Sequence, residues 1–190
     1  MKISFRLFLF FIFFANILFA DNDSYEIIVF SDTRYPKEKK IVIKLLQKEY
    51  PFEDFSKENI PYGKQDNMIT YPDSIYIGKV DLNNDNILDV VVSVRSIIFS
   101  GSHGNTVLFY LIDKNNNWKR IFEVTAYQCI AVLKKTHDGL RNIAFMSFYN
   151  GGDQKEGRII WEWDGKEYQY KGIDPLEKKD WEVFKDEFIR

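Results

Sequence analysis

Hydrophobic and polar positions follow different patterns in successive parts of this 190-residue chain. Residues 1–20 are apolar after a short basic start, and residues 51–73 are irregular and contain three prolines. Residues 74–172 consist of short runs rich in β-branched and aromatic residues, separated by Asn, Asp and Gly. This last pattern is typical of strands joined by tight turns. Because tight turns join antiparallel neighbours, the pattern predicts an antiparallel sheet.

Nine segments have the composition of strands. They are Tyr25–Phe30, Ile75–Val80, Leu88–Ile98, Thr106–Ile112, Trp118–Thr125, Gln128–Lys134, Asn142–Phe148, Arg158–Trp163 and Tyr168–Tyr170. Turn signals rich in Asn, Asp and Gly stand between most of them. The sequence therefore predicts a domain that is mainly β.

Two segments have the pattern of helices. After Pro36, the segment Lys37–Tyr50 carries Ile41, Leu45 and Leu46 on one face, opposite a lysine-rich face. Proline is favoured in the first turn of a helix, so this segment is predicted to be an amphipathic helix.

The second predicted helix closes the chain. The residues Asp174-Pro175-Leu176-Glu177 resemble a helix start, and Trp181, Phe184 and Phe188 follow at helical spacing. We expect this aromatic stripe to dock on the sheet rather than to bind a partner.

The strand-rich region contains an internal repeat. Residues 85–92 align without a gap on residues 138–145, an offset of 53, and this divides the region into units of about 74–125 and 128–172. Each unit resembles one propeller blade, but a propeller needs at least about four blades to close its ring. The predicted fold class is therefore α+β, mainly β: an open twisted antiparallel sheet or a two-sheet stack, with an N-terminal and a C-terminal helix.

The N-terminus has the parts of a secretory signal. Lys2 and Arg6 precede a 14-residue apolar run, Leu7–Ala20, which is followed by the polar residues 21–23. We predict cleavage after Ala20, which leaves residues 21–190 as one exported domain in the periplasm or outside the cell. The alternative is an uncleaved anchor, but 14 helical residues span only about 21 Å of a bilayer core of roughly 30 Å.

Composition and charge narrow the class of partner. With 45% hydrophobic and 28% charged residues, the chain is globular. Removal of residues 1–20 would leave 24 basic and 28 acidic residues, a net charge of −4, which does not favour nucleic acid. No second long apolar run follows, so we expect no integral membrane protein after cleavage. The single cysteine, Cys129, cannot form an internal disulfide and is predicted to be buried.

One motif carries recognisable chemistry. Asp81, Asn83, Asp85 and Asp89 place oxygen-bearing side chains at positions 1, 3, 5 and 9 of a loop, and the carbonyl of Ile87 is available at position 7. Hard divalent cations prefer six or more oxygen ligands, and a loop that curls around such an ion presents alternate side chains inward. The spacing therefore predicts a cation site.

The neighbouring residues complete this loop. Position 6 usually requires a positive φ, and Asn86 is the residue that tolerates it best after glycine. Leu82 and Leu88 are expected to anchor the loop to the core. Val92 stands at position 12, where an EF-hand has a bidentate glutamate, so the loop is not an EF-hand.

The motif and the apolar run that follows it resemble the calcium loop of FG-GAP and VCBS-type repeat proteins. The resemblance implies a structural Ca²⁺ bound by the ligand set Asp81, Asn83, Asp85, Ile87 through its carbonyl, and Asp89. The chain departs from the family in having Asn86 where the family has glycine, which affects the expected affinity more than the loop shape. The second unit, around Asp138 and Asn142, has lost the ligand set and is expected to be a plain turn. The alternative for the first loop is a metal-free turn held by its own side chains.

Two polar segments are candidate partner-binding loops. They contain Ser100, Ser102 and His103 in one segment and Tyr149 and Asp153 in the other. The first segment lacks the strand, Gly-x-Ser-x-Gly turn and helix that position a nucleophilic serine, so a connecting or binding role is favoured over catalysis.

The leading hypothesis from the sequence is an exported, non-catalytic binding or structural module with one calcium loop. Its partner would be an envelope protein or a glycan. Two alternatives remain open at this point: an envelope hydrolase that uses His103, and a proteinaceous inhibitor that acts through the Ser100–Gly104 loop.

Overall fold

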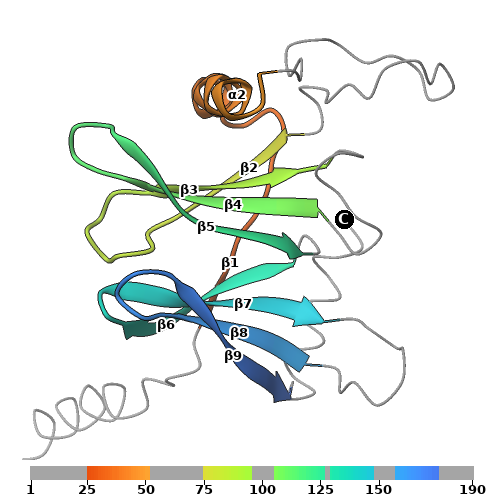
Figure 1. The fold of residues 1–190 in the computed structure, drawn as a ribbon, viewed down its shortest axis with the longest axis vertical. Helices are drawn as coiled ribbons and strands as arrows, with labels where there is room; N and C mark the ends of the chain where they lie inside the picture. Colours follow the sequence, from red (N-terminus) through yellow and green to blue (C-terminus); the bar gives the residue numbers. More distant parts are fainter. Residues whose placement is uncertain (1–24, 52–74, 96–104, 127–128, 148–156, 176–190) are drawn as a thin grey trace, which may run out of the picture.

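The structure is a computed structural model that describes residues 25–51, 75–95, 105–126, 129–147 and 157–175. Two antiparallel sheets lie against each other, and one helix covers the outer face of the smaller sheet (Figure 1). The elements are β1 (Tyr25–Ile27), α2 (Pro36–Glu49), β2 (Ile75–Val80), β3 (Asp89–Val94), β4 (Asn105–Ile112), β5 (Trp118–Ala126), β6 (Ile130–His137), β7 (Leu140–Ser147), β8 (Gly157–Trp163) and β9 (Tyr168–Pro175).

The strand order confirms the predicted fold class. One sheet has the order β2-β3-β4-β5 and the other β1-β6-β7-β8-β9, and every pairing is antiparallel. Strands β2 to β5 form one four-stranded meander, and strands β6 to β9 form a second. Among the described residues, the arrangement is a two-sheet stack with one helix, α2, which precedes the four-stranded sheet in the sequence and packs on it.

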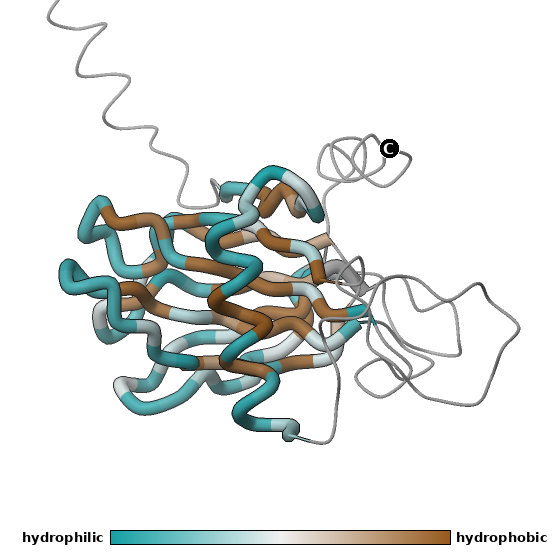
Figure 2. The backbone as a smooth tube through the Cα atoms, turned by 90° about the horizontal axis from the view of Figure 1, so that it is seen from above, coloured by the Kyte–Doolittle hydropathy of each residue, from teal (hydrophilic) through white to brown (hydrophobic). Residues whose placement is uncertain are grey.

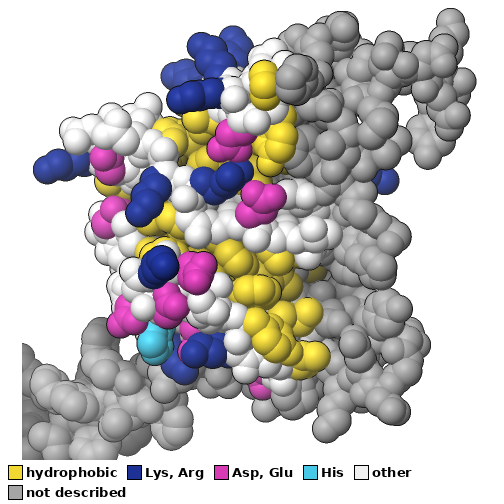
Figure 3. All heavy atoms as spheres, viewed as in Figure 1, with side chains coloured by type: hydrophobic (Ala, Val, Ile, Leu, Met, Phe, Trp, Pro, Cys, Tyr) yellow, Lys and Arg dark blue, Asp and Glu magenta, His cyan; other side chains and the backbone are white. Residues whose placement is uncertain are grey.

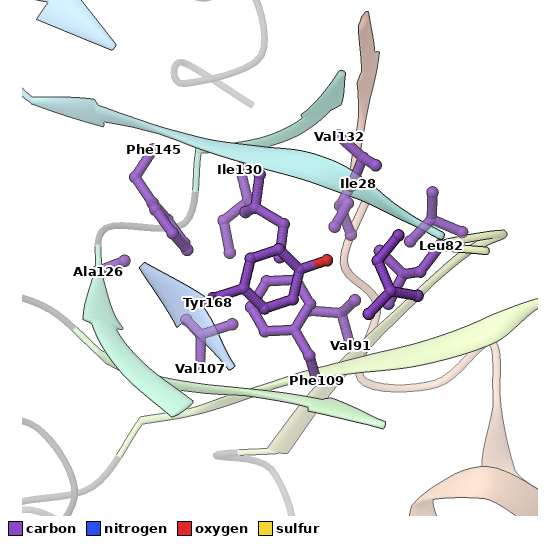
Figure 4. Close-up of a cluster of buried hydrophobic side chains, with 13 residues drawn as sticks. Ile28, Leu82, Val91, Val107, Phe109, Ala126, Ile130, Val132, Phe145 and Tyr168 are labelled. Atoms are coloured by element: carbon purple, nitrogen blue, oxygen red, sulfur yellow. The ribbon is translucent and has the colours of Figure 1, made fainter. Parts of the chain in front are cut away.

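The main core fills the space between the sheets. Strand β3 turns Val91 toward the other sheet, and β4 does the same with Phe109, whereas the intervening side chains face outward. Figure 4 shows Phe109 beside Tyr168 of the five-stranded sheet at the centre of this core. Phe122 of β5 contacts two aromatic rings of the five-stranded sheet. Its ring centroid lies 4.9 Å from that of Tyr168 and 5.0 Å from that of Trp161.

Helix α2 packs on the outer face of the four-stranded sheet, as the amphipathic pattern predicted. Its fully buried residues are Val42 and Leu46, whereas Ile41 and Leu45 are only partly covered. The buried face is therefore centred on Val42, close to the predicted face but rotated from it. Both faces of β3 are buried as a result, which explains its continuous run of valines.

Three predicted boundaries were wrong. Strand β3 begins at Asp89 and the described strand ends at Val94, so it is shorter than Leu88–Ile98. Strand β9 continues to Pro175, because residues 168–175 pair with β8 along its whole length. Asp174 therefore lies opposite Arg158 within the sheet and does not begin a helix. Trp181, Phe184 and Phe188 lie outside the described residues.

The hairpin turns gather at one rim of the molecule. The β2–β3, β4–β5, β6–β7 and β8–β9 connections all lie at the same end, at the left in Figure 1. Figure 2 shows that these turns are hydrophilic while the strands between them are hydrophobic. Within the described ranges, no helix is long and apolar enough to span a membrane. Residues 1–20, the predicted signal, lie outside those ranges.

Candidate metal site

The Asp81–Asp89 loop connects β2 to β3 at the hairpin rim. The first strand pair closes with Val80 opposite Asp89, so the two ends of the loop are fixed by the sheet. Asn84 and Asn86 have φ values of 59° and 67°, in the left-handed region that asparagine tolerates better than most residues. The positive φ predicted for position 6 is confirmed.

The side chains at positions 1, 3 and 5 are joined by hydrogen bonds within the loop. The backbone N–H of Asp85 donates to Asp81 Oδ1 and to Asn83 Oδ1, each at 3.2 Å. Asn86 donates its N–H to Asp81 Oδ2 at 2.8 Å, and Asn83 Nδ2 donates to Asp85 Oδ2 at 2.9 Å. Three of the four predicted ligand side chains therefore lie together.

Asp89, at position 9, lies behind them and is fully buried. Its two oxygens accept hydrogen bonds from the backbone N–H groups of Leu82 and Ile112, each at 2.8 Å. The pKa of the Asp89 carboxyl is raised from 3.8 to about 6, chiefly by burial and in smaller part by the charges of Asp85 and Asp81, against the lowering effect of the two N–H groups. Within the described residues, no Lys, Arg or His forms an ion pair with Asp89.

The apolar anchors of the loop differ in part from the prediction. Leu82 is fully buried in the core between the sheets, as expected. Leu88 is 53% exposed, so its predicted anchoring role was wrong. Ile87 is partly buried and packs against the cluster beneath α2 in its place.

Sequence reasoning missed Arg141, which holds this loop from the other sheet. Its backbone N–H donates to the carbonyl of Leu82 at 2.8 Å, and its Nη1 donates to the carbonyl of Asp81 at 3.0 Å. The same buried guanidinium donates to the carbonyls of Leu133 and Val132 of β6, at 2.9 and 3.0 Å, and lies 3.1 Å from Glu26. Arg141 stands where the first unit has Leu88, so the repeat gave no signal for it.

The residues of the loop fit a hard cation by the chemistry of their donors. All the candidate side chains offer oxygens, and a buried carboxylate without a cationic partner is the kind of group that metal binding satisfies. In the described parts of the chain, no three His, Cys, Asp or Glu side chains are grouped as ready metal ligands. The side-chain oxygens of Asp81, Asn83 and Asp85 accept hydrogen bonds from N–H groups of the same loop, so the arrangement also suits the metal-free turn.

The corresponding turn of the second unit is a tight hairpin. Asp138 and Gly139 have φ values of 46° and 89°, and Asn142 takes the place of Asp89. Asn142 is buried and donates its Nδ2 to Glu162 at 3.1 Å. The side chain of Glu162 is only 16% exposed, and its partners are Asn142, Lys135 and Lys171.

The predicted partner-binding residues lie outside the described residues. These are Ser100, Ser102, His103, Tyr149 and Asp153. The strands leading into the two segments, β3 and β7, both end at the rim opposite the hairpin turns (Figure 1). The other histidine, His137, is exposed, and its Nδ1 lies 2.9 Å from the carbonyl of Trp163. Cys129 is buried, as predicted.

Comparison of the chain with protein-family models, with curated protein sequences and with solved structures finds no match. The resemblance to FG-GAP and VCBS-type repeats therefore rests on the loop residues and stays an expectation.

Proposed function

We propose that this protein is an exported, non-catalytic binding or structural module whose Asp81–Asp89 loop binds Ca²⁺. In this proposal Asp81, Asn83 and Asp85 supply side-chain oxygens, Ile87 supplies its carbonyl, and Asp89 closes the site from the core side. The ion would supply positive charge that holds the loop oxygens together.

The buried carboxylate of Asp89 carries the proposal. A buried charge is costly unless it is paired or coordinates a metal, and the charges of Asp85 and Asp81 add to the cost of ionising Asp89. Hydrogen bonds from two N–H groups orient this carboxylate but leave its charge uncompensated. A divalent cation would neutralise most of the charge of the three groups.

The position of the loop supports a structural role for the ion. Asp89 accepts an N–H from each side of β3: Leu82 follows β2, and Ile112 ends β4. An ion held at this point would therefore stabilise the end of β2, the start of β3 and the end of β4.

Calcium titration tests the metal part of the proposal. Protein from the exported fraction, whose first residue should be Asp21 by mass spectrometry, is followed by calorimetry and by thermal melting with and without Ca²⁺. An affinity in the range of extracellular modules, about 10⁻⁴–10⁻³ M, would stabilise the fold by about 1.5–3 kcal/mol at 10 mM Ca²⁺. Mg²⁺ at the same concentration should give a smaller gain, because it prefers a tighter octahedral site.

A matched pair of variants separates metal binding from turn formation. Asp85→Asn keeps an oxygen for the loop hydrogen bonds but removes a ligand charge, and should lower the calcium-dependent gain in melting temperature. Asp164→Asn makes the same change in the β8–β9 turn, where Asp164 Oδ1 accepts the N–H groups of Lys166 and Glu167, and should leave that gain intact. Absence of any calcium-dependent gain in the unmodified protein would overturn the metal proposal and leave the metal-free turn.

A further inference from the structure

Helix α2 presents a row of unpaired lysines on its outward face. Lys37, Lys40, Lys44 and Lys48 are all exposed, and their spacing of three, four and four residues places them along one side of the helix. Figure 3 shows basic side chains gathered at the end of the molecule where α2 lies. Within the described residues, none of these four lysines forms an ion pair.

The acidic residues of the helix are occupied elsewhere. Glu38 pairs with Lys79 of β2, and Glu49 pairs with Arg120 of β5 at 2.7 Å. Both glutamates therefore bind the sheet beneath the helix. The fifth lysine, Lys39, is also held locally, because its Nζ donates to the carbonyl of Asp32 at 3.1 Å. The inward side of α2 is charge-balanced, and the outward side is purely basic.

Stability of the helix does not account for this row. A lysine in the last turn, such as Lys48, interacts favourably with the helix dipole, but Lys37 lies in the first turn, where positive charge is unfavourable. No acidic residue stands among the four lysines on the outward face to offset their mutual repulsion. Within the described residues, no ion pair offsets the repulsion along this row.

We propose that the outward face of α2 is a docking surface for an anionic lipid bilayer, bound through Lys37, Lys40, Lys44 and Lys48. The row covers 11 helical rises, about 16 Å, in a straight line, which suits a flat charged surface. All four groups are lysines, compact point charges that attract phosphate without the two-pronged geometry of arginine.

This docking is independent of the calcium loop. The loop lies at the hairpin rim, whereas α2 covers the outer face of the four-stranded sheet. The predicted export would bring the protein to a membrane surface. Each lysine near such a surface should strengthen binding about fivefold at low salt, so removal of two should weaken it about 25-fold.

Vesicle sedimentation tests the proposal with the full chain. The readout is the ratio of binding to vesicles with about 30 mol% phosphatidylglycerol over binding to pure phosphatidylcholine, so that contributions independent of lipid charge cancel. The ratio should be well above one, and should fall toward one as salt rises from about 0.05 to about 0.5 M. The double variant Lys40→Gln/Lys44→Gln should lower it about 25-fold. The control Lys114→Gln/Lys166→Gln removes two exposed lysines from the hairpin rim and should leave it unchanged.

Other outcomes would overturn the proposal. A ratio near one for the unmodified chain, or equal losses in the two double variants, would show that the lysine row does not select anionic lipid. Binding of a single-stranded oligonucleotide that depends on Lys40 and Lys44, without vesicle binding, would assign the row to nucleic acid. Concentration-dependent self-association lost in the same variant, again without vesicle binding, would assign it to a second copy. Unchanged circular dichroism and melting in both variants confirm that folding is intact.

Discussion

Replacement of Arg141 by methionine tests how the two sheets are held together. The guanidinium donates to two buried carbonyls of β6, those of Leu133 and Val132, and to the part-buried carbonyl of Asp81. These contacts span the point where β6 bulges, between Val132 and Thr136, and where the Asp81–Asp89 loop leaves β2. Methionine keeps much of the apolar length of the side chain but donates to none of these oxygens.

The size of the effect follows from the groups left without partners. An unsatisfied buried acceptor costs about 1–3 kcal/mol, so the loss of three acceptor contacts should destabilise the fold by about 3–5 kcal/mol. The ion pair with Glu26 adds little, because the Glu26 side chain is 53% exposed. Arg141→Lys, which can reach fewer of these oxygens, should fall between methionine and arginine.

Arg158 supplies a matched control in the same sheet. It is as deeply buried as Arg141, and its Nη2 donates to Asp174, whose side chain is 47% exposed. Its Nε has no hydrogen-bond partner among the described residues. Within the same residues, the Arg158 guanidinium donates to no backbone carbonyl. Arg158→Met should therefore cost no more than about 1 kcal/mol.

Urea denaturation of the variants at pH 7, with EDTA present, measures both costs. Circular dichroism and tryptophan fluorescence should report the same transition, with an unchanged dependence on urea. Equal costs for Arg141→Met and Arg158→Met would refute the reasoning, because burial and charge alone would then explain both. A cost below about 1 kcal/mol for Arg141→Met would refute it as well.

Two further predictions concern the same fold. In the metal-free protein the pKa of Asp89 in the folded state, about 6, lies above its ordinary value of 3.8. Between these two pH values the folded state therefore binds more protons than the unfolded state. Stability should fall as the pH rises from 4 to about 6. The loss should approach about 3 kcal/mol and disappear in Asp89→Asn; a flat profile in the unmodified protein, measured by urea denaturation at each pH, would contradict it. Gly78→Ala should destabilise the fold by about 1–3 kcal/mol, because its methyl group would overlap a methyl of Ile28 and lie 3.4 Å from the carbonyl oxygen of Val29. A melting temperature equal to that of the unmodified protein would show that the contact between Gly78 and residues 28–29 can adjust to the added methyl group.

The fold was predictable where local chemistry decides it. Proline at position 36 and the apolar face behind it define α2, and all nine strand segments recur with shifts of a few residues at their ends. The positive φ of Asn86 could be predicted because the loop spacing demands a turn there. These features depend on residues within a few positions of one another.

The errors arose where distant segments decide the structure. Asp174 and Pro175 have the pattern of a helix start, but the pairing of Asp174 with Arg158 extends β9 through them. Leu88 was expected to be buried because it is apolar, yet β3 begins after it and leaves it exposed. The local sequence pattern does not determine which strand the end of another strand will pair with.

The two units of the predicted repeat carry buried charges of opposite sign at neighbouring positions, and one of these charged groups contacts the other unit. Leu88 and Asp89 of the first unit correspond to Arg141 and Asn142 of the second, as the offset of 53 aligns them. The first unit keeps the buried carboxylate, while the second replaces it with a neutral amide and places a buried cation one residue earlier. That cation donates to the carbonyl of Asp81, at the start of the first unit's loop. The loop with three carboxylates thus has a buried positive group at its first residue, supplied by the other sheet. The contacts of Arg141 with Asp81 and Leu82 therefore add polar bonds to the apolar core that the two sheets share.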